Sequence, residues 1–212
     1  MSVERKKAIY EVCVKYDVII VEDDPYYALQ AGEYSLPDAR PKSSSSETDE
    51  EFLKSLIPSF LRYDYQGRVV RIDTFSKTIC PGSRLGYITS NPIFSERFLR
   101  ANESSTQAPC GFAQALVAKL LVEEWGMPGW YRWLKGLKAQ YRDRRDVLVD
   151  NLLQFGGAQL EKRMENGTIE LRTQAKVEND EWVAAKTLLS FVPPQGGMFG
   201  AFLISSRPCV AR

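Results

Sequence analysis

Residues 18–27 read VIIVEDDPYY, and this stretch decides the fold class. Its four consecutive β-prone apolar residues, 18–21, predict a strand that is buried on both faces, as in a parallel sheet. Pro25 ends the regular structure just past the carboxyl end of that strand. The preceding residues, 3–16, carry charges between apolar positions at helical spacing (Ile9, Val12, Cys13 and Tyr16) and predict an amphipathic helix packed on the core. A helix followed by a buried strand indicates an α/β fold with a mostly parallel sheet and flanking helices.

The following residues extend this pattern. VVRID at residues 69–73 predicts a second buried strand, and LGYI at 85–88 predicts a third. Residues 52–61 predict a short helix. The segment PDARPKSSSSETDEE at residues 37–51 has too little apolar surface to pack, so we expect it to form an exposed loop inserted within a domain.

The second half of the chain is expected to be helical and then to return to strands. Apolar residues at helical spacing predict a helix over 112–121, which the glycines of 126–129 end, and a long helix over 130–152. Asn166-Gly167 is a hairpin signal, and PPQGGMFGAFLI at residues 193–204 predicts a glycine turn followed by a strand. We therefore expect two domains, residues 1–138 and residues 139–212.

Composition excludes several classes of function. The 212 residues hold 28 Lys and Arg against 27 Asp and Glu, so a formal charge of +1 gives no reason to expect a nucleic-acid partner. The basic residues of 142–145 alternate with aspartates and predict a solvated helix face. The absence of histidine removes Ser-His-Asp and Cys-His nucleophile systems and the usual histidine ligands of zinc. Proton transfer must therefore depend on Lys, Tyr, Asp, Glu or Cys.

The cysteines and the hydropathy pattern indicate the compartment. Cys13, Cys80, Cys110 and Cys209 are widely scattered and include no CxxC pair, which is typical of reduced thiols in a cytoplasmic protein. An uninterrupted apolar run of the ~20 residues that a membrane span needs is missing from the sequence, so we expect no membrane association. No metal site is predicted.

Two segments carry candidate chemistry, because functional groups collect where strands of such sheets end in loops. In the segment DTFSKTICPGSR, residues 73–84, Lys77 and Arg84 could together hold an aldehyde and a phosphate, since lysine amines form Schiff bases and a guanidinium matches a phosphate dianion. In the segment EDDPYY, Asp24 could keep a pyridine nitrogen protonated, and Tyr27 could bond a ring hydroxyl. An ordinary surface loop and a structural turn remain the competing interpretations of each segment taken alone.

Together, the segments VIIVEDDPYYALQ and RIDTFSKTICPGSRLGYIT resemble the pyridoxal-phosphate (PLP) aminotransferases of fold type I, class I/II. The resemblance is greatest to the aromatic amino-acid, 2-aminoadipate and kynurenine aminotransferases. The segments RKKAIYEVCVKYD, QAPCGFAQAL and PPQGGMFGAF also fit this family. The resemblance implies part of the fold type I large domain, followed by the start of the small C-terminal domain.

The resemblance also implies a role for each site residue. Lys77 matches the lysine that carries PLP, Asp24 the partner of the pyridine nitrogen, and Tyr27 the partner of the 3-hydroxyl. Thr74, Ser76 and Arg84 match the positions that hold the phosphate. Near the substrate, the family has a loop that resembles residues Gly196, Gly197, Met198 and Phe199.

The implied reaction transfers an amino group from an aromatic or related amino acid to a 2-oxo acid, with Lys77 moving the proton. A homodimer is implied for a full-length protein. The family's Asn-Pro motif and its substrate-carboxylate arginine have no recognisable counterpart, so we expect a chain truncated at both ends. Three interpretations stay open: an aminotransferase or its central part, a non-catalytic PLP-binding or degenerate fragment, and another PLP reaction on the same fold.

Overall fold

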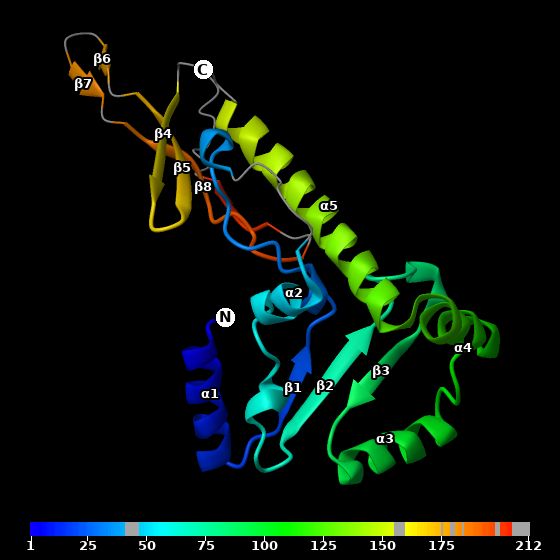
Figure 1. The fold of residues 1–212 in the computed structure, drawn as a ribbon. Helices are drawn as coiled ribbons and strands as arrows, with labels where there is room; N and C mark the ends of the chain where they lie inside the picture. Colours follow the sequence, from blue (N-terminus) through cyan, green and yellow to red (C-terminus); the bar gives the residue numbers. More distant parts are fainter. Residues whose placement is uncertain are drawn as a thin grey trace. The chain divides into compact units, whose positions relative to one another are not determined.

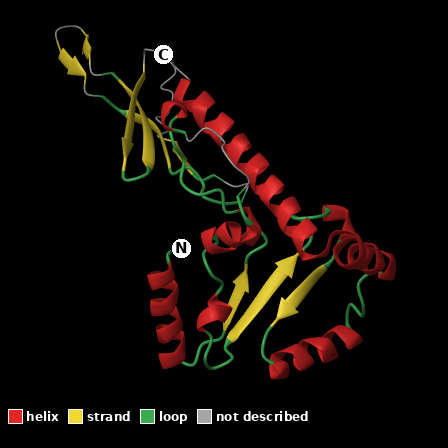
Figure 2. Cartoon of the chain, in the orientation of Figure 1, coloured by secondary structure: helices red, strands yellow, loops and turns green. Residues whose placement is uncertain are grey.

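The computed structural model describes residues 1–40, 47–154, 160–174, 176–178, 181–183, 185–197 and 200–204. The chain divides into two compact units (Figure 1). Unit 1 comprises Met1–Leu29 and Ser46–Leu137, and unit 2 comprises Gln30–Ser45 and Lys138–Arg212. Both units combine helices with strands (Figure 2), so the predicted α/β class is confirmed.

Unit 1 contains a three-stranded sheet in the order β1-β2-β3, formed by β1 (Ile20–Asp23), β2 (Val69–Thr74) and β3 (Gly86–Thr89). β1 pairs parallel to β2 with Glu22 opposite Arg71, whereas β3 pairs antiparallel to β2 with Tyr87 opposite Asp73. The predicted mostly parallel sheet is thus represented by one parallel pair and one antiparallel pair in the described residues.

The prediction that the first and third strands are buried on both faces is wrong for the described structure. In β1, Ile20 and Glu22 are buried, while Val21 is 62% exposed, and every residue of β3 is exposed. The reason is that α1 (Val3–Lys15) and η3 (Phe60–Tyr63) pack on the face that carries Ile20 and Val69. Among the described residues of the opposite face, Val70 of β2 is also buried, at 2% exposed, whereas its neighbour Val21 is not covered.

The first predicted helix is confirmed as α1, and its predicted face is partly correct, since Ile9 and Cys13 pack against the core whereas Tyr16 is exposed. Ser2 caps its N-terminus by accepting a hydrogen bond from the Arg5 amide. Lys6 and Tyr10 are buried, and Val12 is 55% exposed. The Tyr10 hydroxyl donates to Asp64 Oδ1 at 2.8 Å, which explains why an amphipathic tyrosine occupies the packed face.

The helix predicted over residues 52–61 is two shorter elements, α2 (Asp49–Ser55) and η3. Thr48 and Glu51 form a capping box at the start of α2. Pro58 lies between the two elements and prevents a continuous helix. Of the predicted loop 37–51, residues 41–46 lie outside the described residues, and the remainder includes the short helix η2 (Pro37–Ala39) and the start of α2.

Four helical segments follow the sheet: α3 (Pro92–Ser104), α4 (Gly111–Ala118), the π-helical η5 (Lys119–Trp125) and α5 (Gly126–Gln154). Gly126 separates η5 from α5 with a φ of +55°, a conformation that glycine adopts at little cost. The two predicted helices are therefore confirmed. None of the helices in the described ranges is long and apolar enough to cross a membrane.

Unit 2 contains an antiparallel sheet in the order β4-β5-β8-β9. Its strands are β4 (Leu160–Glu165), β5 (Thr168–Thr173), β8 (Thr187–Phe191) and β9 (Phe202–Ile204), and β6 (Lys176–Glu178) pairs with β7 (Glu181–Val183). The predicted hairpin is confirmed, since Asn166 and Gly167 both have positive φ between β4 and β5. Val149 of α5 packs with Ile169 and Phe191 to form the core of this unit.

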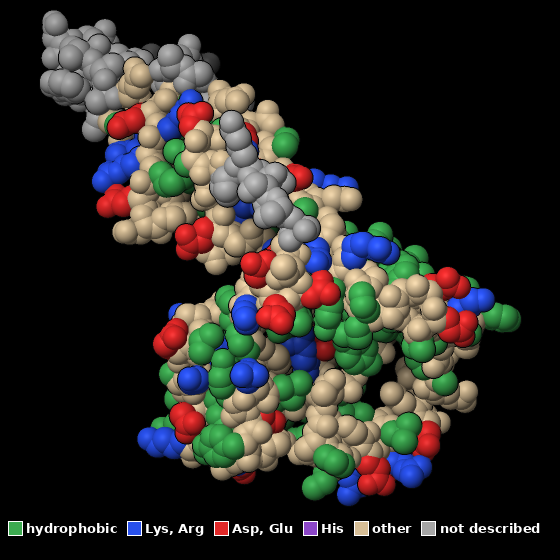
Figure 3. Space-filling model, viewed as in Figure 1, with side chains coloured by type: hydrophobic (Ala, Val, Ile, Leu, Met, Phe, Trp, Pro, Cys, Tyr) green, Lys and Arg blue, Asp and Glu red, His purple; other side chains and the backbone are tan. Residues whose placement is uncertain are grey.

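The predicted solvated face of α5 is only partly correct. Arg142 and Arg144 are exposed, but Arg145 and Asp146 are buried. Arg145 pairs with Asp146 at 2.8 Å and donates to the backbone carbonyls of Gly32 and Pro194. A buried arginine of this kind satisfies carbonyl groups that loops leave unpaired. On the face drawn in Figure 3, basic and acidic side chains are interspersed rather than separated.

Candidate functional site

Unit 1 positions the first pair of candidate residues at the carboxyl end of β1. Asp24 follows β1 directly, and Tyr27 begins the short helix η1 (Tyr27–Leu29). The Asp24 carbonyl accepts a hydrogen bond from the Tyr27 amide at 3.2 Å, so the two residues belong to one turn. The Tyr27 ring lies over the guanidinium of Arg71, with 4.4 Å between Arg71 Cζ and the ring centroid.

Thr74, Ser76 and Arg84 come together beyond the carboxyl end of β2. Thr74 Oγ1 donates to Ser76 Oγ at 3.0 Å and accepts from the Ser76 amide at 3.1 Å. A nitrogen of Arg84 lies 3.5 Å from Ser76 Oγ. Two hydroxyls and one guanidinium thus converge in a loop, which is the donor set that a phosphate dianion requires.

The backbone of Arg84 is strained in a way that fits a functional position. Arg84 has φ +48° and ψ 37°, in the left-handed region that non-glycine residues seldom adopt. It follows the short helix η4 (Pro81–Ser83) and precedes the strand β3. Such strain is found preferentially at binding sites, where the surrounding structure enforces it.

Lys77 lies in the loop between Thr74 and η4, and its side chain is partly buried. Its Nζ atom is 5.8 Å from the centroid of the Tyr26 ring. The adjacent Thr78 is buried, and its carbonyl accepts a hydrogen bond from the Trp133 indole at 2.6 Å. The Phe75 carbonyl accepts from the amides of Thr78 and Ile79. These contacts fix the backbone on both sides of the candidate lysine.

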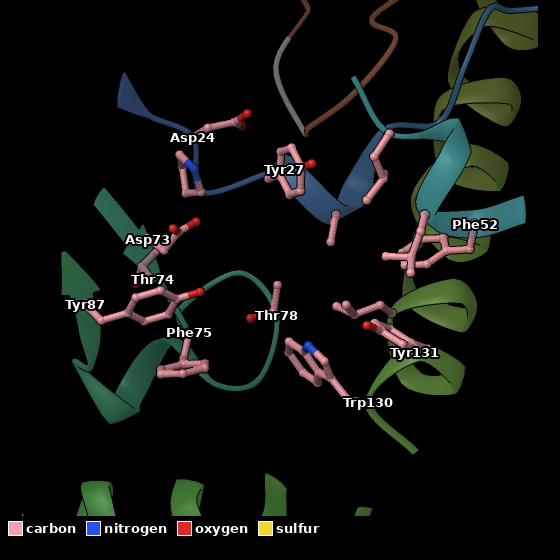
Figure 4. A pocket seen from close by; sticks show the side chains of 15 residues that line it. Asp24, Tyr27, Phe52, Asp73, Thr74, Phe75, Thr78, Tyr87, Trp130 and Tyr131 are labelled. Carbon is pink, nitrogen blue, oxygen red and sulfur yellow. The ribbon is translucent and has the colours of Figure 1, made fainter. Parts of the chain in front are cut away.

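A cavity of about 180 Å³ in unit 1 lies against these segments (Figure 4). Its polar lining includes Asp24 beyond β1, Asp73 and Thr74 at the end of β2, and Tyr87 of β3. Aromatic side chains also line it, namely Tyr27, Phe52, Phe75, Trp130 and Tyr131, and the Phe75 ring lies beside Tyr87 with 5.6 Å between the ring centroids. A cavity with apolar walls and a few convergent polar groups is typical of a small-molecule site.

Burial perturbs the acids at this cavity. Desolvation raises the pKa of the Asp24 carboxyl, and the positive charge of Arg71 opposes that rise. Desolvation also raises the pKa of the Tyr27 phenol, again against the effect of Arg71. A half-buried carboxylate gains from a nearby cation, so Asp24 suits a protonated ring nitrogen. The Tyr27 phenol keeps its proton at neutral pH and can donate to an anionic oxygen.

A network of buried charged side chains connects α1 to this site, and it was not predicted from the sequence. Glu22 accepts from Lys6 Nζ at 3.1 Å and from Arg71 at 3.5 Å. Arg71 in turn donates two hydrogen bonds to Asp73, at 2.7 and 2.8 Å. The sequence VVRID contains the information that could have predicted this network, because alternate residues of a strand share a face and Arg71 and Asp73 therefore lie on the same face as the core residue Val69.

The predicted substrate loop belongs to unit 2. Gly197 has φ +73°, and Gly196 forms a bridge with Gln30. The Gln195 carbonyl accepts from the amides of Ala31 and Gly32 at 2.7 and 3.2 Å. Met198 and Phe199 lie outside the described residues. The structure therefore brings Asp24, Tyr27, Thr74, Ser76, Lys77 and Arg84 into one unit and describes the two glycines in the other.

The fold and this set of side chains define the class of protein. The family model for aminotransferase class I and II matches residues 1–171, and the chain belongs to that family. Members of the family generally depend on PLP and act on amino acids and 2-oxo acids. The donors of unit 1 fit that cofactor, since hydroxyls and a guanidinium suit its phosphate and Asp24 suits its ring nitrogen.

Two relatives show which aminotransferases this chain is similar to. An aromatic amino acid aminotransferase of Schizosaccharomyces pombe is 45% identical over 150 residues, which cover 70% of this chain and 31% of the relative. The L-tyrosine:2-oxoglutarate aminotransferase of Serpula lacrymans is 45% identical over 149 residues, 69% of this chain and 28% of the relative.

Solved structures give the same family. The aminotransferase Aro8 of Candida albicans matches with a TM-score of 0.71 and 41% identity, covering 82% of this chain and 37% of that one. The aromatic aminotransferase Aro9 of the same organism matches with a TM-score of 0.75 and 27% identity over 99% of this chain and 38% of that one. The chain thus spans about a third of the length of the relatives that it matches.

Proposed function

We propose that this chain forms the lysine side of a PLP-dependent aminotransferase that transfers an amino group from an aromatic or related amino acid to a 2-oxo acid. The observation that carries the proposal is the presence, in one unit, of Asp24 and Tyr27 beyond β1 and of the phosphate donors and Lys77 beyond β2. The activities for which the relatives are named support the aromatic donor and, in one case, 2-oxoglutarate as the acceptor.

The proposed roles follow from the position of each group. Thr74, Ser76 and Arg84 bind the phosphate, and Asp24 holds the ring nitrogen in its protonated state. Tyr27 donates its phenolic proton to the ring oxygen. When bound, PLP supplies an electron sink that acidifies the substrate α-carbon. Lys77 carries the proton that leaves this carbon, because an uncharged lysine amine can act as a general base.

In the balanced reaction, the donor amino acid becomes a 2-oxo acid and the acceptor 2-oxo acid becomes an amino acid. Gly196 and Gly197, with Met198 and Phe199, are proposed to line the substrate. The division into a PLP-binding large domain, residues 1–138, and a partial small domain, residues 139–212, is part of the same proposal. A homodimer is proposed for the full-length protein.

A cytoplasmic location is proposed from the thiols. Cys13 is partly buried, while Cys80 and Cys110 are exposed, and all three are free cysteines in the described structure. Exposed free thiols are typical of reducing compartments. Cys209 lies outside the described residues.

Borohydride trapping tests the site. The purified chain is incubated with PLP and reduced, and the labelled residue is located by peptide mass analysis. We expect a pyridoxyl group on Lys77 and its loss in Lys77→Ala. Lys54→Ala is the matched control, because Lys54 is an exposed lysine that pairs only with Glu50 in the described contacts. A label elsewhere, or none, would contradict the site assignment.

A non-catalytic PLP-binding fragment is the second candidate, and the observation that supports it is the coverage of about a third of each relative. Amino transfer from tyrosine or phenylalanine to 2-oxoglutarate separates the two candidates. A chain labelled at Lys77 that transfers no amino group would favour the binding fragment. Analysis of the products would identify another PLP reaction, such as β-elimination or decarboxylation.

A further inference from the structure

The buried charges of unit 1 form a set that reaches from the core to the proposed cofactor site. On one face of the sheet, Ile20 and Val69 are paired across β1 and β2, and Glu22 and Arg71 form the next pair of the same alternation. Asp24 and Asp73 are the next residues of the same alternation, after Glu22 and Arg71 respectively, and both of them line the cavity. Arg71 is therefore the cation of this face that acts on both cavity-lining carboxylates, because it pairs with Asp73 and its charge acts on Asp24 more strongly than that of Lys6.

The side chain of Arg71 is only 7% exposed, and each of its contacts is defined. Its fork donates two hydrogen bonds to Asp73, the strong bidentate geometry. It also reaches Glu22, whose oxygens accept from Lys6, from the Ser59 hydroxyl and from the Phe60 amide. Glu22 is thus fully engaged in hydrogen bonds away from the cavity.

The Tyr27 ring covers one face of the Arg71 guanidinium, with 4.4 Å between Arg71 Cζ and the ring centroid. This cation–π contact fixes the plane of the ring whose hydroxyl is proposed to bond the cofactor. Tyr27 begins η1 three residues after Asp24, and its amide donates to the Asp24 carbonyl, so the position of the ring also fixes the turn that presents Asp24.

The charges of this set do not cancel. Lys6 and Arg71 are two cations, and Glu22, Asp73 and Asp24 are three carboxylates. Ion pairs join the cations to Glu22 and Asp73, whereas Asp24 accepts from the backbone amide of Tyr26. The unbalanced negative charge of these five side chains therefore belongs to Asp24, at the cavity.

We propose that Arg71 is a positioning residue of the cofactor site, which together with Lys6 neutralises Glu22 and Asp73 and which holds Tyr27, so that Asp24 alone presents a negative charge to a cationic ring nitrogen. This inference rests on the proposed function, and it assigns to that site a residue that touches neither the phosphate nor the reacting atoms. The groups that face Asp24 are Arg71 and Asp73 of β2, Glu22 of β1, Lys6 of α1, Tyr27 of η1 and Tyr87 of β3.

The test measures how pH affects the binding of pyridoxamine phosphate to the whole chain. This probe carries the ring nitrogen and phosphate of PLP but forms no Schiff base with Lys77, so it isolates the non-covalent contacts. Its own ionisations are the same for every variant, and differences between variants therefore report the protein. Asp24→Asn identifies the acid limb of the profile, since that limb is expected to disappear in this variant.

Two substitutions should move the acid limb in opposite directions. Arg71→Met removes the cation that favours the ionised Asp24, so the limb should move to higher pH. Asp73→Asn is nearly isosteric and leaves Arg71 with more uncompensated positive charge, so the limb should move to lower pH. A purely structural role predicts weaker binding in both variants with no opposed displacement.

Arg71→Lys keeps the positive charge but loses the bidentate guanidinium. Its acid limb should lie close to that of the unsubstituted chain, and this variant can be measured even if Arg71→Met does not fold. Arg68→Met is the matched control, because Arg68 precedes β2 and pairs with the distant Asp17 at 2.7 Å. It should leave the limb unchanged. A chain that binds the probe with an unmoved limb in Asp73→Asn, or in Arg71→Met where that variant folds, overturns the inference alone. Failure of the unsubstituted chain to bind the probe overturns both the inference and the proposed function.

Discussion

The left-handed backbone of Arg84 makes two substitutions at one position informative. Arg84→Ala and Arg84→Gly both remove the guanidinium, but only glycine relieves the strain of φ +48°. A non-glycine residue in this region costs about 1–2 kcal/mol. Glycine gives back roughly 0.4–1 kcal/mol through the greater entropy of its unfolded chain. Arg84→Gly should therefore be more stable than Arg84→Ala by roughly 0.8 kcal/mol, the difference between the midpoints of these two ranges.

Thermal unfolding can resolve this difference. For a chain of this length, 1 kcal/mol corresponds to a shift of about 2–4 °C in Tm, so the glycine variant should melt about 1–4 °C above the alanine variant. The side-chain contacts that both variants lose are weak, since Arg84 lies 3.4 Å from the Pro81 carbonyl and 3.5 Å from Ser76 Oγ. Neither variant should fall far below the unsubstituted chain in stability.

The affinity for pyridoxamine phosphate should fall in both variants alike. A hydrogen bond to a charged group contributes about 1.5–3 kcal/mol, so the loss of the guanidinium should weaken pyridoxamine phosphate binding by roughly ten- to a hundredfold in both variants. Gln107 provides the control, because it also has positive φ, at +59°, and follows α3 in an exposed turn. Gln107→Gly should gain stability relative to Gln107→Ala and keep the affinity. If Arg84→Ala melted above Arg84→Gly, or if either variant kept the affinity, the argument would fail.

Three further changes test other parts of the structure. Gly86→Ala should disrupt the β2–β3 pairing and weaken phosphate binding, because its Cβ would lie 2.6 Å from a backbone carbonyl of β2; a Tm above that of the unsubstituted chain would contradict this. Trp133→Phe removes the hydrogen bond to the Thr78 carbonyl and should cost about 1 kcal/mol in urea unfolding while speeding hydrogen exchange around Lys77. Burial and the Asp150 hydrogen bond raise the pKa of Tyr34 from 10.0 to about 12, so Tyr34 should add stability below pH 10 that is lost as the pH rises toward 12, and Tyr34→Phe should flatten that dependence.

The sequence predicted the elements whose signals are local. The helix at residues 3–16, the strand at 69–73 and the Asn166-Gly167 turn each carry their own periodicity or turn chemistry, and all three are found. The parallel pairing of β1 and β2 places the two candidate segments at one edge of the sheet, and their role in binding a cofactor stays a prediction.

The sequence did not predict which faces are buried. VIIV at residues 18–21 is apolar at every position, and only the packing of Tyr10 and Phe60 on Ile20 decides that Val21 is exposed. Nor could composition show that Arg145 turns inward, because its partners are backbone carbonyls of segments distant in the chain. Such contacts depend on the tertiary arrangement rather than on the local pattern.

Stability alone does not account for the buried charges beneath the proposed site. Removing two opposite charges from water costs free energy that their attraction often fails to recover, and apolar replacements of buried ion pairs are frequently neutral or stabilising. Lys6, Glu22 and Arg71 are all below 10% exposed, within a face whose other members are Ile20 and Val69. Apolar residues at those positions would leave Asp73 and Asp24 as adjacent carboxylates at the cavity without a cation between the strands, and one of them would then take up a proton. The buried guanidinium of Arg71, joined to Asp73, opposes the desolvation that raises the pKa of Asp24, and under the proposed function this effect gives a reason for the charged residue that interrupts the apolar strand.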